Sequence, residues 1–246
     1  MSDPLPLVTC IMPTYGRPEY VCESVGMFLD QDYPAKELLI YNDCAGQIFE
    51  SRDPEVRIFN TDHRFDSLGE KRNACIEAAR GEFIAIWDDD DIYLPWRLSY
   101  SLSEAQRWNT PFYRPEAFLA FWNEESLHDN HSVPGWISHP TVMFRKSLWT
   151  EVGGYPACNV GEDAEFFARI HEHLGQTFIT YPIHPDDRFM ILRGASMYAH
   201  MSISGGAYAL DTAPGIYAAS RRPVSDPRLY KDLCRIRNLR SLGQPR

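Results

Sequence analysis

Four short apolar segments in the first half of the chain constrain its fold more than any other feature. Segments 7–13 (LVTCIMP), 37–43 (ELLIYND) and 82–87 (EFIAIW) are almost continuously apolar, as expected of strands buried on both faces, and 55–60 (EVRIFN) is a shorter run of the same kind. Helical patterns separate them: one from Glu19 to Leu29, and one over 67–80 with Gly81 just past its end. Strands that alternate with helices predict an α/β fold with a single, mostly parallel, Rossmann-like sheet and helices on both of its faces.

The pattern changes after Asp91. Pro95 is placed to begin a helix through 96–108, and a second helix is expected over 162–174 with Gly175 as its stop. Segments 117–127, 141–146, 177–183 and 189–194 are expected strands, and His128 and His131 fall in an expected polar loop. We therefore expect one domain over 1–220, with a nucleotide-binding half to about residue 95 and a mixed half over 96–220.

Charge and composition limit the classes of partner. The 246 residues carry a formal net charge of −10, which disfavours nucleic acid as a partner. No run approaches the ~18 apolar residues of a membrane span, and no basic start with an apolar core marks a signal peptide, so we expect a cytoplasmic protein. Residues 221–246 hold eight Arg or Lys against two acids and are expected to form a basic, helical tail. Contact with lipid at the inner membrane face, packing on the domain and a homodimer all remain open roles for it.

The stretch GEFIAIWDDDDIYLP (81–95) places four aspartates, Asp88 to Asp91, directly after a buried strand. Ligands of open α/β sheets bind beyond the carboxyl ends of the strands. Alternate strand residues point the same way, so Asp88 and Asp90 are expected to converge. Their mutual repulsion favours a divalent cation with hard oxygen ligands, Mg²⁺ or Mn²⁺, which in turn favours a nucleoside diphosphate as ligand. The alternative is a solvated acidic loop.

Five motifs in order carry a resemblance to a known family. CIMPTYGRP, ELLIYNDCAG, GEKRNACIEAARGEFIAIWDDDDIYLPWRL, HPTVMFRKSLWTEVGGY and GEDAEFF resemble glycosyltransferase family 2, whose members have the GT-A fold, over about residues 7–175. The resemblance implies an inverting, nucleotide-sugar-dependent glycosyltransferase with its acceptor side in the second half of the domain.

The resemblance also assigns roles to individual residues. It implies nucleotide contacts by Pro13, Thr14, Tyr15, Arg17, Asn42, Asp43, Lys71, Arg72, Asp88 and Asp89, metal ligation by Asp90, Asp88 and His200, and general base catalysis by Asp163. Asn42 departs from the family, which usually carries two adjacent acids there, and this departure bears on the choice of base. Asp91 is expected to cap the following helix.

These observations predict a metal-dependent inverting glycosyltransferase that uses Mn²⁺ or Mg²⁺. Its donor is a nucleoside diphosphate sugar, with UDP favoured, and its acceptor is a hydroxyl of a glycan, a lipid-linked saccharide or a small molecule. A non-catalytic nucleotide-sugar or glycan-binding module is the main alternative. A nucleotidyltransferase is a weaker one, because the chain lacks the Gly-rich N-terminal signature of that class.

Overall fold

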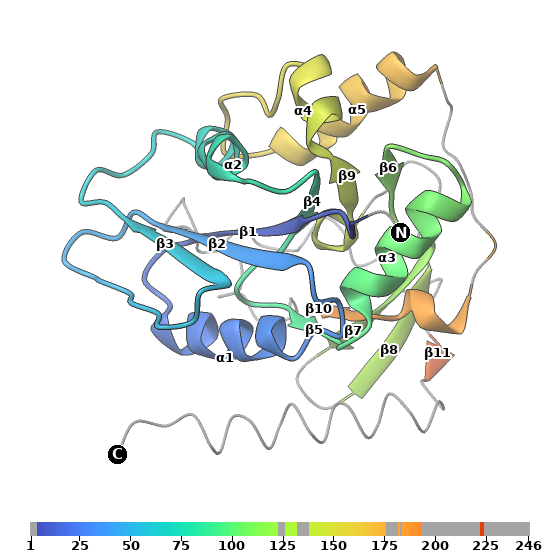
Figure 1. The fold of residues 1–246 in the computed structure, drawn as a ribbon, viewed down its shortest axis with the longest axis horizontal. Coiled ribbons are helices and arrows are strands. Elements are labelled where there is room, and N and C mark those ends of the chain that lie inside the picture. The colour runs from blue at the N-terminus through green and yellow to red at the C-terminus, as the bar shows by residue number, and fades with distance from the viewer. Residues whose placement is uncertain are drawn as a thin grey trace.

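The computed structural model describes residues 4–122, 126–131, 138–175, 182, 184–192 and 222–223. They form an α/β fold with two sheets (Figure 1). The strand order of the first sheet is β3-β2-β1-β4-β9-β6. Its strands are β1 (Val8–Thr14), β2 (Lys36–Asn42), β3 (Val56–Asn60), β4 (Phe83–Ile86), β6 (Phe112–Tyr113) and β9 (Met143–Arg145).

Strands β1 to β4 are parallel, as predicted, and only β9 and β6 add antiparallel pairs at one side of the sheet. Thr14 is in register with Asn42, and Asn42 with Asn60. The carboxyl ends of these strands therefore lie at one edge of the sheet, which is where an α/β fold places its ligand.

Helices cover both faces of this sheet, as predicted. Helix α1 (Pro18–Leu29) lies on one face and α2 (Leu68–Ala78), α4 (Lys146–Glu151) and α5 (Glu162–Leu174) on the other, as Figure 1 shows. Alternate residues of β1 enter different cores, because Cys10 and Met12 pack with the α1 side while Ile11 packs with α2 and α5. This double burial explains the continuous apolar runs.

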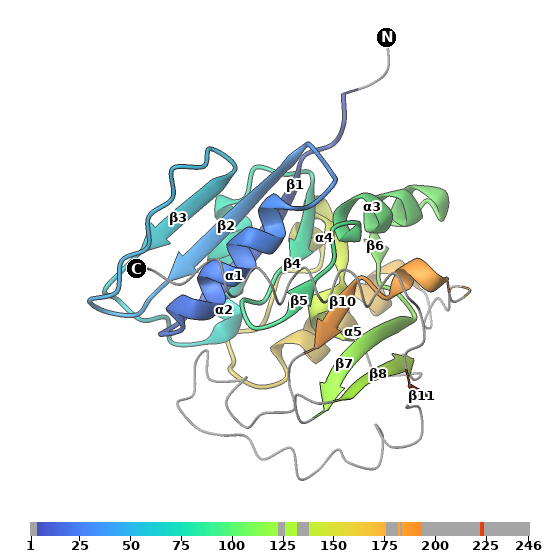
Figure 2. The ribbon, with the colours of Figure 1, turned by 90° about the horizontal axis from the view of Figure 1, so that it is seen from below.

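The mixed second half contributes a second sheet with the order β11-β8-β7-β10-β5. Its strands are β5 (Ile92–Tyr93), β7 (Ala117–Trp122), β8 (Ser126–His131), β10 (Met190–Leu192) and β11 (Arg222–Pro223). Helix α3 (Arg97–Arg107) shares a core with β7 and β10 and with α1. Figure 2 shows β7 lying between β8 and β10 in this second sheet. The single strand expected over 117–127 is wrong, because this segment turns back as the β7–β8 hairpin, and His128 and His131 lie on β8 instead of in a loop.

Two further details differ from the sequence predictions. Helix α2 ends at Ala78, three residues before Gly81, and Gly81 is needed for another reason: a Cβ there would lie 2.6 Å from the Thr9 nitrogen. Asp91 caps no helix, because α3 begins only at Arg97 with Trp96 as its N-cap.

Only two residues of the predicted basic tail are described. Arg222 and Pro223 form β11 and pair with β8, so they belong to the second sheet, and the helix expected in the tail otherwise lies outside the described residues. The strand expected over 177–183 also lies almost entirely outside them. Among the described helices, none combines the length and the hydropathy that a membrane span requires.

Candidate active site

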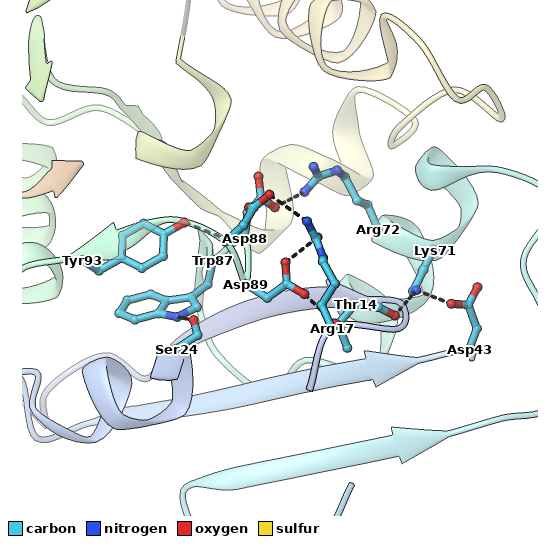
Figure 3. A network of polar contacts seen from close by, with 11 residues as sticks. Thr14, Arg17, Ser24, Asp43, Lys71, Arg72, Trp87, Asp88, Asp89 and Tyr93 are labelled. Carbon is cyan, nitrogen blue, oxygen red and sulfur yellow. Dashed lines mark hydrogen bonds and ion pairs between the residues drawn. The ribbon is translucent and has the colours of Figure 1, made fainter. Parts of the chain in front are cut away.

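The carboxyl edge of the first sheet gathers most of the residues that the sequence singled out. Thr14 ends β1, Arg17 follows in the β1–α1 loop, and Asp43 follows β2. Asp88, Asp89 and Asp90, here called the acid turn, follow β4, and Figure 3 shows Asp88 and Asp89 facing the Arg17 and Arg72 side chains.

Arg17 joins two neighbouring carboxylates of the acid turn. Its Nη2 lies 2.5 Å from Asp89 Oδ1 and its Nη1 lies 2.8 Å from Asp90 Oδ2. The Thr14 hydroxyl donates to the other Asp89 oxygen at 2.5 Å. The Asp89 side chain is 0% exposed, whereas the Asp90 side chain is 13% exposed. Asp89 is therefore saturated by protein donors, and Asp90 is the carboxylate nearer to solvent.

Arg72, on α2, joins the acid turn to the start of α5. Its Nη1 lies 3.2 Å from Asp88 Oδ1, and its Nε lies 3.7 Å from Glu162 Oε1. A nucleotide contact is predicted for Arg72, and its pairing with Glu162 is a contact that the sequence did not indicate. A buried guanidinium between two acids fixes their positions. Arg72 therefore aligns the two acidic motifs of the chain, the acid turn and the Glu162–Asp163 pair at the start of α5.

The charges of the site shift the pKa values of its acids in opposite directions. Burial and the Asp90 charge raise the pKa of Asp89 well above the usual range, although Arg17 and Thr14 oppose the shift. Burial also raises the pKa of Asp88, but the Arg72 guanidinium, together with His139 and Arg17, more than offsets this and holds that pKa below the usual range. Four carboxyl groups, those of the acid turn and Glu162, thus share two guanidinium groups.

Asp43 and Lys71, both predicted to contact a nucleotide, lie in the interior. Lys71 is fully buried, donates to the Thr14 carbonyl at 2.6 Å and pairs with Asp43. The second Asp43 oxygen accepts the Phe65 N–H at 3.1 Å. Burial lowers the pKa of Lys71, and the bond to Asp43 opposes this. The pair ties the ends of β1 and β2 to α2. In this structure it therefore stabilises the carboxyl edge of the first sheet from the interior of the protein.

The structure explains why position 42 holds an amide. The Asn42 Nδ2 donates to the Gln47 carbonyl at 2.7 Å and to Asn60 Oδ1 at 3.1 Å, and its Oδ1 accepts the Cys44 N–H at 3.2 Å. An ionised aspartate has no donor for the first two bonds. Asn42 therefore closes the loop after β2.

Pro13 and Tyr15 are predicted to contact the nucleotide. Tyr15 is half-buried, and Pro13 is buried within β1. The Arg64 guanidinium lies 4.0 Å from the centre of the Tyr15 ring, a contact that the sequence did not indicate. An aromatic ring held by a cation at this edge offers a flat surface for a nucleobase.

The predicted base, Asp163, is the second residue of α5 and is half-buried. It is close enough to the buried His139 for its charge to act on that ring, as does the charge of Asp88. The two acidic motifs therefore lie near the same imidazole. His139 is held by Tyr155, whose hydroxyl is 2.9 Å from its Nε2.

Arg97 and Tyr93, both overlooked in the sequence, hold the beginning of the acid turn. Arg97 is 1% exposed and donates to the carbonyls of Ile86, the last residue of β4, and Pro140. Its guanidinium lies 4.1 Å from the Tyr93 ring centre, and the Tyr93 hydroxyl accepts the Asp88 N–H at 2.9 Å. Only the contacts between distant segments reveal these roles.

Asp88 and Asp90 of the acid turn are predicted ligands of a divalent metal ion. The expected convergence of Asp88 and Asp90 stays a prediction: β4 ends at Ile86, and in the turn that follows it Asp88 pairs with Arg72 and Asp90 with Arg17. Within the described residues, no group of three or more His, Cys, Asp or Glu is arranged to hold a metal ion. His200 lies outside the described residues.

The chemistry of the available ligand atoms nevertheless fits a divalent ion. Carboxylate oxygens are the ligands that Mg²⁺ and Mn²⁺ prefer, and the Asp88 and Asp90 side chains are partly exposed, at 21% and 13%. A cationic group, the Arg17 guanidinium, already lies against Asp90. These residues could hold a divalent ion at the acid turn.

The structure is an α/β domain with a cluster of charged residues at the carboxyl edge of its parallel sheet, and comparison with known proteins gives the family. The family profile described as Glycosyl transferase family 2 matches residues 9–167, and the chain belongs to this family.

Individual relatives are more distant. The chain is 26% identical over 147 residues to UDP-Glc:alpha-D-GlcNAc-diphosphoundecaprenol beta-1,3-glucosyltransferase WfgD of Escherichia coli, covering 58% of this chain and 55% of the relative. It is 31% identical over 109 residues to the putative colanic acid biosynthesis glycosyl transferase WcaA of Escherichia coli, covering 42% and 39%. The crystal structure of S. aureus TarS 1–349 in complex with UDP-GlcNAc matches with a TM-score of 0.56 at 18% identity, covering 80% of this chain and 61% of TarS. The chain thus spans about half, or less, of the length of these curated relatives.

Proposed function

We propose that this protein is an inverting glycosyltransferase that moves a sugar from a UDP-sugar to an acceptor hydroxyl. The observation that carries the proposal is the acid turn at the carboxyl edge of the parallel sheet, within a chain of glycosyltransferase family 2. The choice of UDP is supported by the relative named for UDP-Glc and by the TarS structures with UDP and UDP-GlcNAc.

The donor binds along the strand edge in this proposal. Tyr15 offers its ring to the base, and the backbone of Pro13 and Thr14 lines the edge beside it. Arg17 and Arg72 supply the positive charge that a diphosphate needs, since guanidinium groups bind phosphate oxygens with paired hydrogen bonds. Lys71 and its partner Asp43, together with Asn42, keep the ends of β1 and β2 in place.

Asp88 and Asp90 would hold a divalent ion, Mn²⁺ or Mg²⁺, with Asp90 as the direct ligand. When bound, such an ion neutralises the negative charge of a departing diphosphate. Asp89 has no free oxygen for this purpose, because Arg17 and Thr14 occupy both of its oxygens. Its role is to hold Arg17 and the turn.

Asp163 is the proposed general base. It takes the proton from the acceptor hydroxyl as the oxygen attacks the anomeric carbon, and the nucleoside diphosphate leaves from the opposite face. The short distance between the two acidic motifs, bridged by Arg72, supports the placement of donor and acceptor side by side. A single displacement requires no covalent sugar intermediate, so the product has the inverted anomeric configuration.

A nucleotide screen tests the proposal. The melting temperature of the purified protein is measured with UDP, GDP, ADP and TDP and with the corresponding nucleotide sugars, each with and without Mn²⁺. Release of nucleoside diphosphate is then measured with mixtures of glycan, lipid-linked and small-molecule acceptors. We expect UDP-sugars with Mn²⁺ to stabilise the protein and UDP to be released. Stabilisation without any UDP release, even by slow hydrolysis, would instead indicate a binding module, and stabilisation by no nucleotide would contradict the proposal.

A further inference from the structure

The neighbours of Arg17 in sequence fix the position of its backbone. Gly16 before it has φ of +69°, a conformation that favours glycine, and Pro18 after it begins α1. Its backbone position is thus set by the β1–α1 loop. A change of partner for Arg17 requires rotation of the side chain alone.

Its guanidinium now binds the carboxylate that the proposed metal needs. The Arg17 Nη1 lies 2.8 Å from Asp90 Oδ2, while Nη2 is held by the buried Asp89. A guanidinium held against Asp90 Oδ2 disfavours a divalent ion at this carboxylate, because the two positive charges repel each other. The present contact of Arg17 therefore opposes the binding of a divalent ion to Asp90.

The local charge shows why the pair forms without a ligand. The acid turn places three carboxylates side by side, and Arg17 and Arg72 form ion pairs with them. Burial lowers the pKa of Arg17, but Asp90 and Asp89 more than reverse this. Arg17 thus neutralises the turn when no other cation does.

We propose that Arg17 is a resident counter-cation that competes with the divalent ion for Asp90, and that it is released when a donor diphosphate offers it new anionic partners. Metal and donor then bind cooperatively: the ion binds weakly to the free protein, and UDP raises its affinity by drawing Arg17 away from Asp90. This inference rests on the proposed function, since it requires metal and UDP to bind at this edge. Such coupling would protect the acid turn from metal in the absence of donor.

The test is a titration of the full chain with Mn²⁺, followed by electron paramagnetic resonance and calorimetry, with and without UDP. Arg17→Gln removes the charge and keeps hydrogen-bonding groups, whereas Arg17→Lys keeps the charge. Arg107→Gln is the matched control for net charge, because the Arg107 side chain on α3 is 64% exposed. Circular dichroism and melting in the same buffer confirm that each variant is folded.

We expect Arg17→Gln to bind Mn²⁺ without UDP about tenfold more tightly than wild type, a change of one decade in Kd. The factor by which UDP raises Mn²⁺ affinity should shrink in that variant and persist in Arg17→Lys and Arg107→Gln. The inference is overturned if Arg17→Gln gains no affinity for Mn²⁺, or if Arg17→Lys gains as much as Arg17→Gln. If no protein binds Mn²⁺ even with UDP, both the inference and the metal requirement fall, whereas Mn²⁺ binding that Arg17 does not influence removes the inference alone.

Discussion

Asp163 stands at the second position of α5, where the first turn of a helix stabilises a carboxylate whatever its function. Its nearness to His139, to Glu162 and to the acid turn distinguishes it from an ordinary helix-start acid. The position agrees with a base that serves an acceptor beside the donor.

If Asp163 is the base, Asp163→Asn should lower kcat by about 10²–10⁴-fold, the usual effect of a positioned general base. UDP affinity, measured by calorimetry, should stay within about threefold of wild type, because the change leaves the acid turn intact. Glu165→Gln is the control, since that side chain lies on the same helix, is 53% exposed and pairs with Arg169. Turnover of Asp163→Asn close to that of the control would remove Asp163 from its proposed role.

His139 gives a prediction about pH. Burial and the Arg72 charge lower its pKa from the ordinary 6.5, although Asp163 and Asp88 oppose the shift. The unfolded chain therefore takes up a proton as the pH falls below about 6.5 while the folded protein does not, so stability is lost on the acid side. Between pH 7.5 and 5.5 the loss should be about 1 kcal/mol from this residue.

The contribution of His139 to this loss is measured by urea unfolding of wild type and His139→Gln at pH 7.5 and pH 5.5. The glutamine amide can still meet the Tyr155 hydroxyl but cannot titrate, so the fall in unfolding free energy from pH 7.5 to 5.5 should be smaller than in wild type by about 1 kcal/mol. Equal falls in wild type and His139→Gln would show that the folded protein protonates His139.

At the scale of elements, α2 positions α5 through unusually close backbone contact. Gly69, in the first turn of α2, lies against the 156–158 segment, and a Cβ there would be 1.8 Å from the Pro156 carbonyl oxygen. Asn73 on the same helix holds both the N–H and the carbonyl of Tyr155, each at 2.9 Å. The segment that leads into α5 is thus tied to α2.

Gly69→Ala should therefore displace the start of α5 and reduce stability by about 1–3 kcal/mol, because backbone atoms cannot yield as a flexible side chain does. It should also lower turnover more than UDP affinity, since α5 carries Asp163, whereas Thr14, Tyr93 and Arg97 hold the acid turn and its strand from outside α2 and α5. Gly26→Ala in α1 is the matched control, with nothing within 4 Å of its added Cβ. This control should gain about 0.5–1 kcal/mol. Denaturant unfolding with a donor-turnover assay measures both effects, and a stable, active Gly69→Ala would contradict the proposed coupling.

The elements themselves could be predicted to different degrees. The apolar runs of β1, β2 and β4 were predictable because both faces of each strand are buried, so few polar residues lie within them. The β7–β8 hairpin was missed because its turn carries no Gly or Asn-Gly signal, and 117–127 read as one strand. Gly81 looked like a helix stop, but its reason is the close approach of Thr9, a contact between distant segments.

At the scale of the whole molecule, the sequence could predict which residues lie together at the candidate site but not which of them form ion pairs. Parallel strands bring their carboxyl ends to one edge, so Thr14, Asp43 and the acid turn were expected together, and they are. Which acid pairs with which cation depends on tertiary packing. Arg17 binding to Asp90 and the burial of Lys71 therefore emerged only from the structure.

The central claim is that the acid turn binds a nucleoside diphosphate through a divalent ion. Calorimetric titration of UDP into wild type and Asp90→Asn, each with Mn²⁺ and with EDTA, tests it most directly. We expect Mn²⁺ to tighten UDP binding to wild type by about tenfold or more and to have little effect on the variant. UDP affinity that is the same with Mn²⁺ and EDTA in wild type, or that Mn²⁺ still raises fully in Asp90→Asn, would contradict the claim.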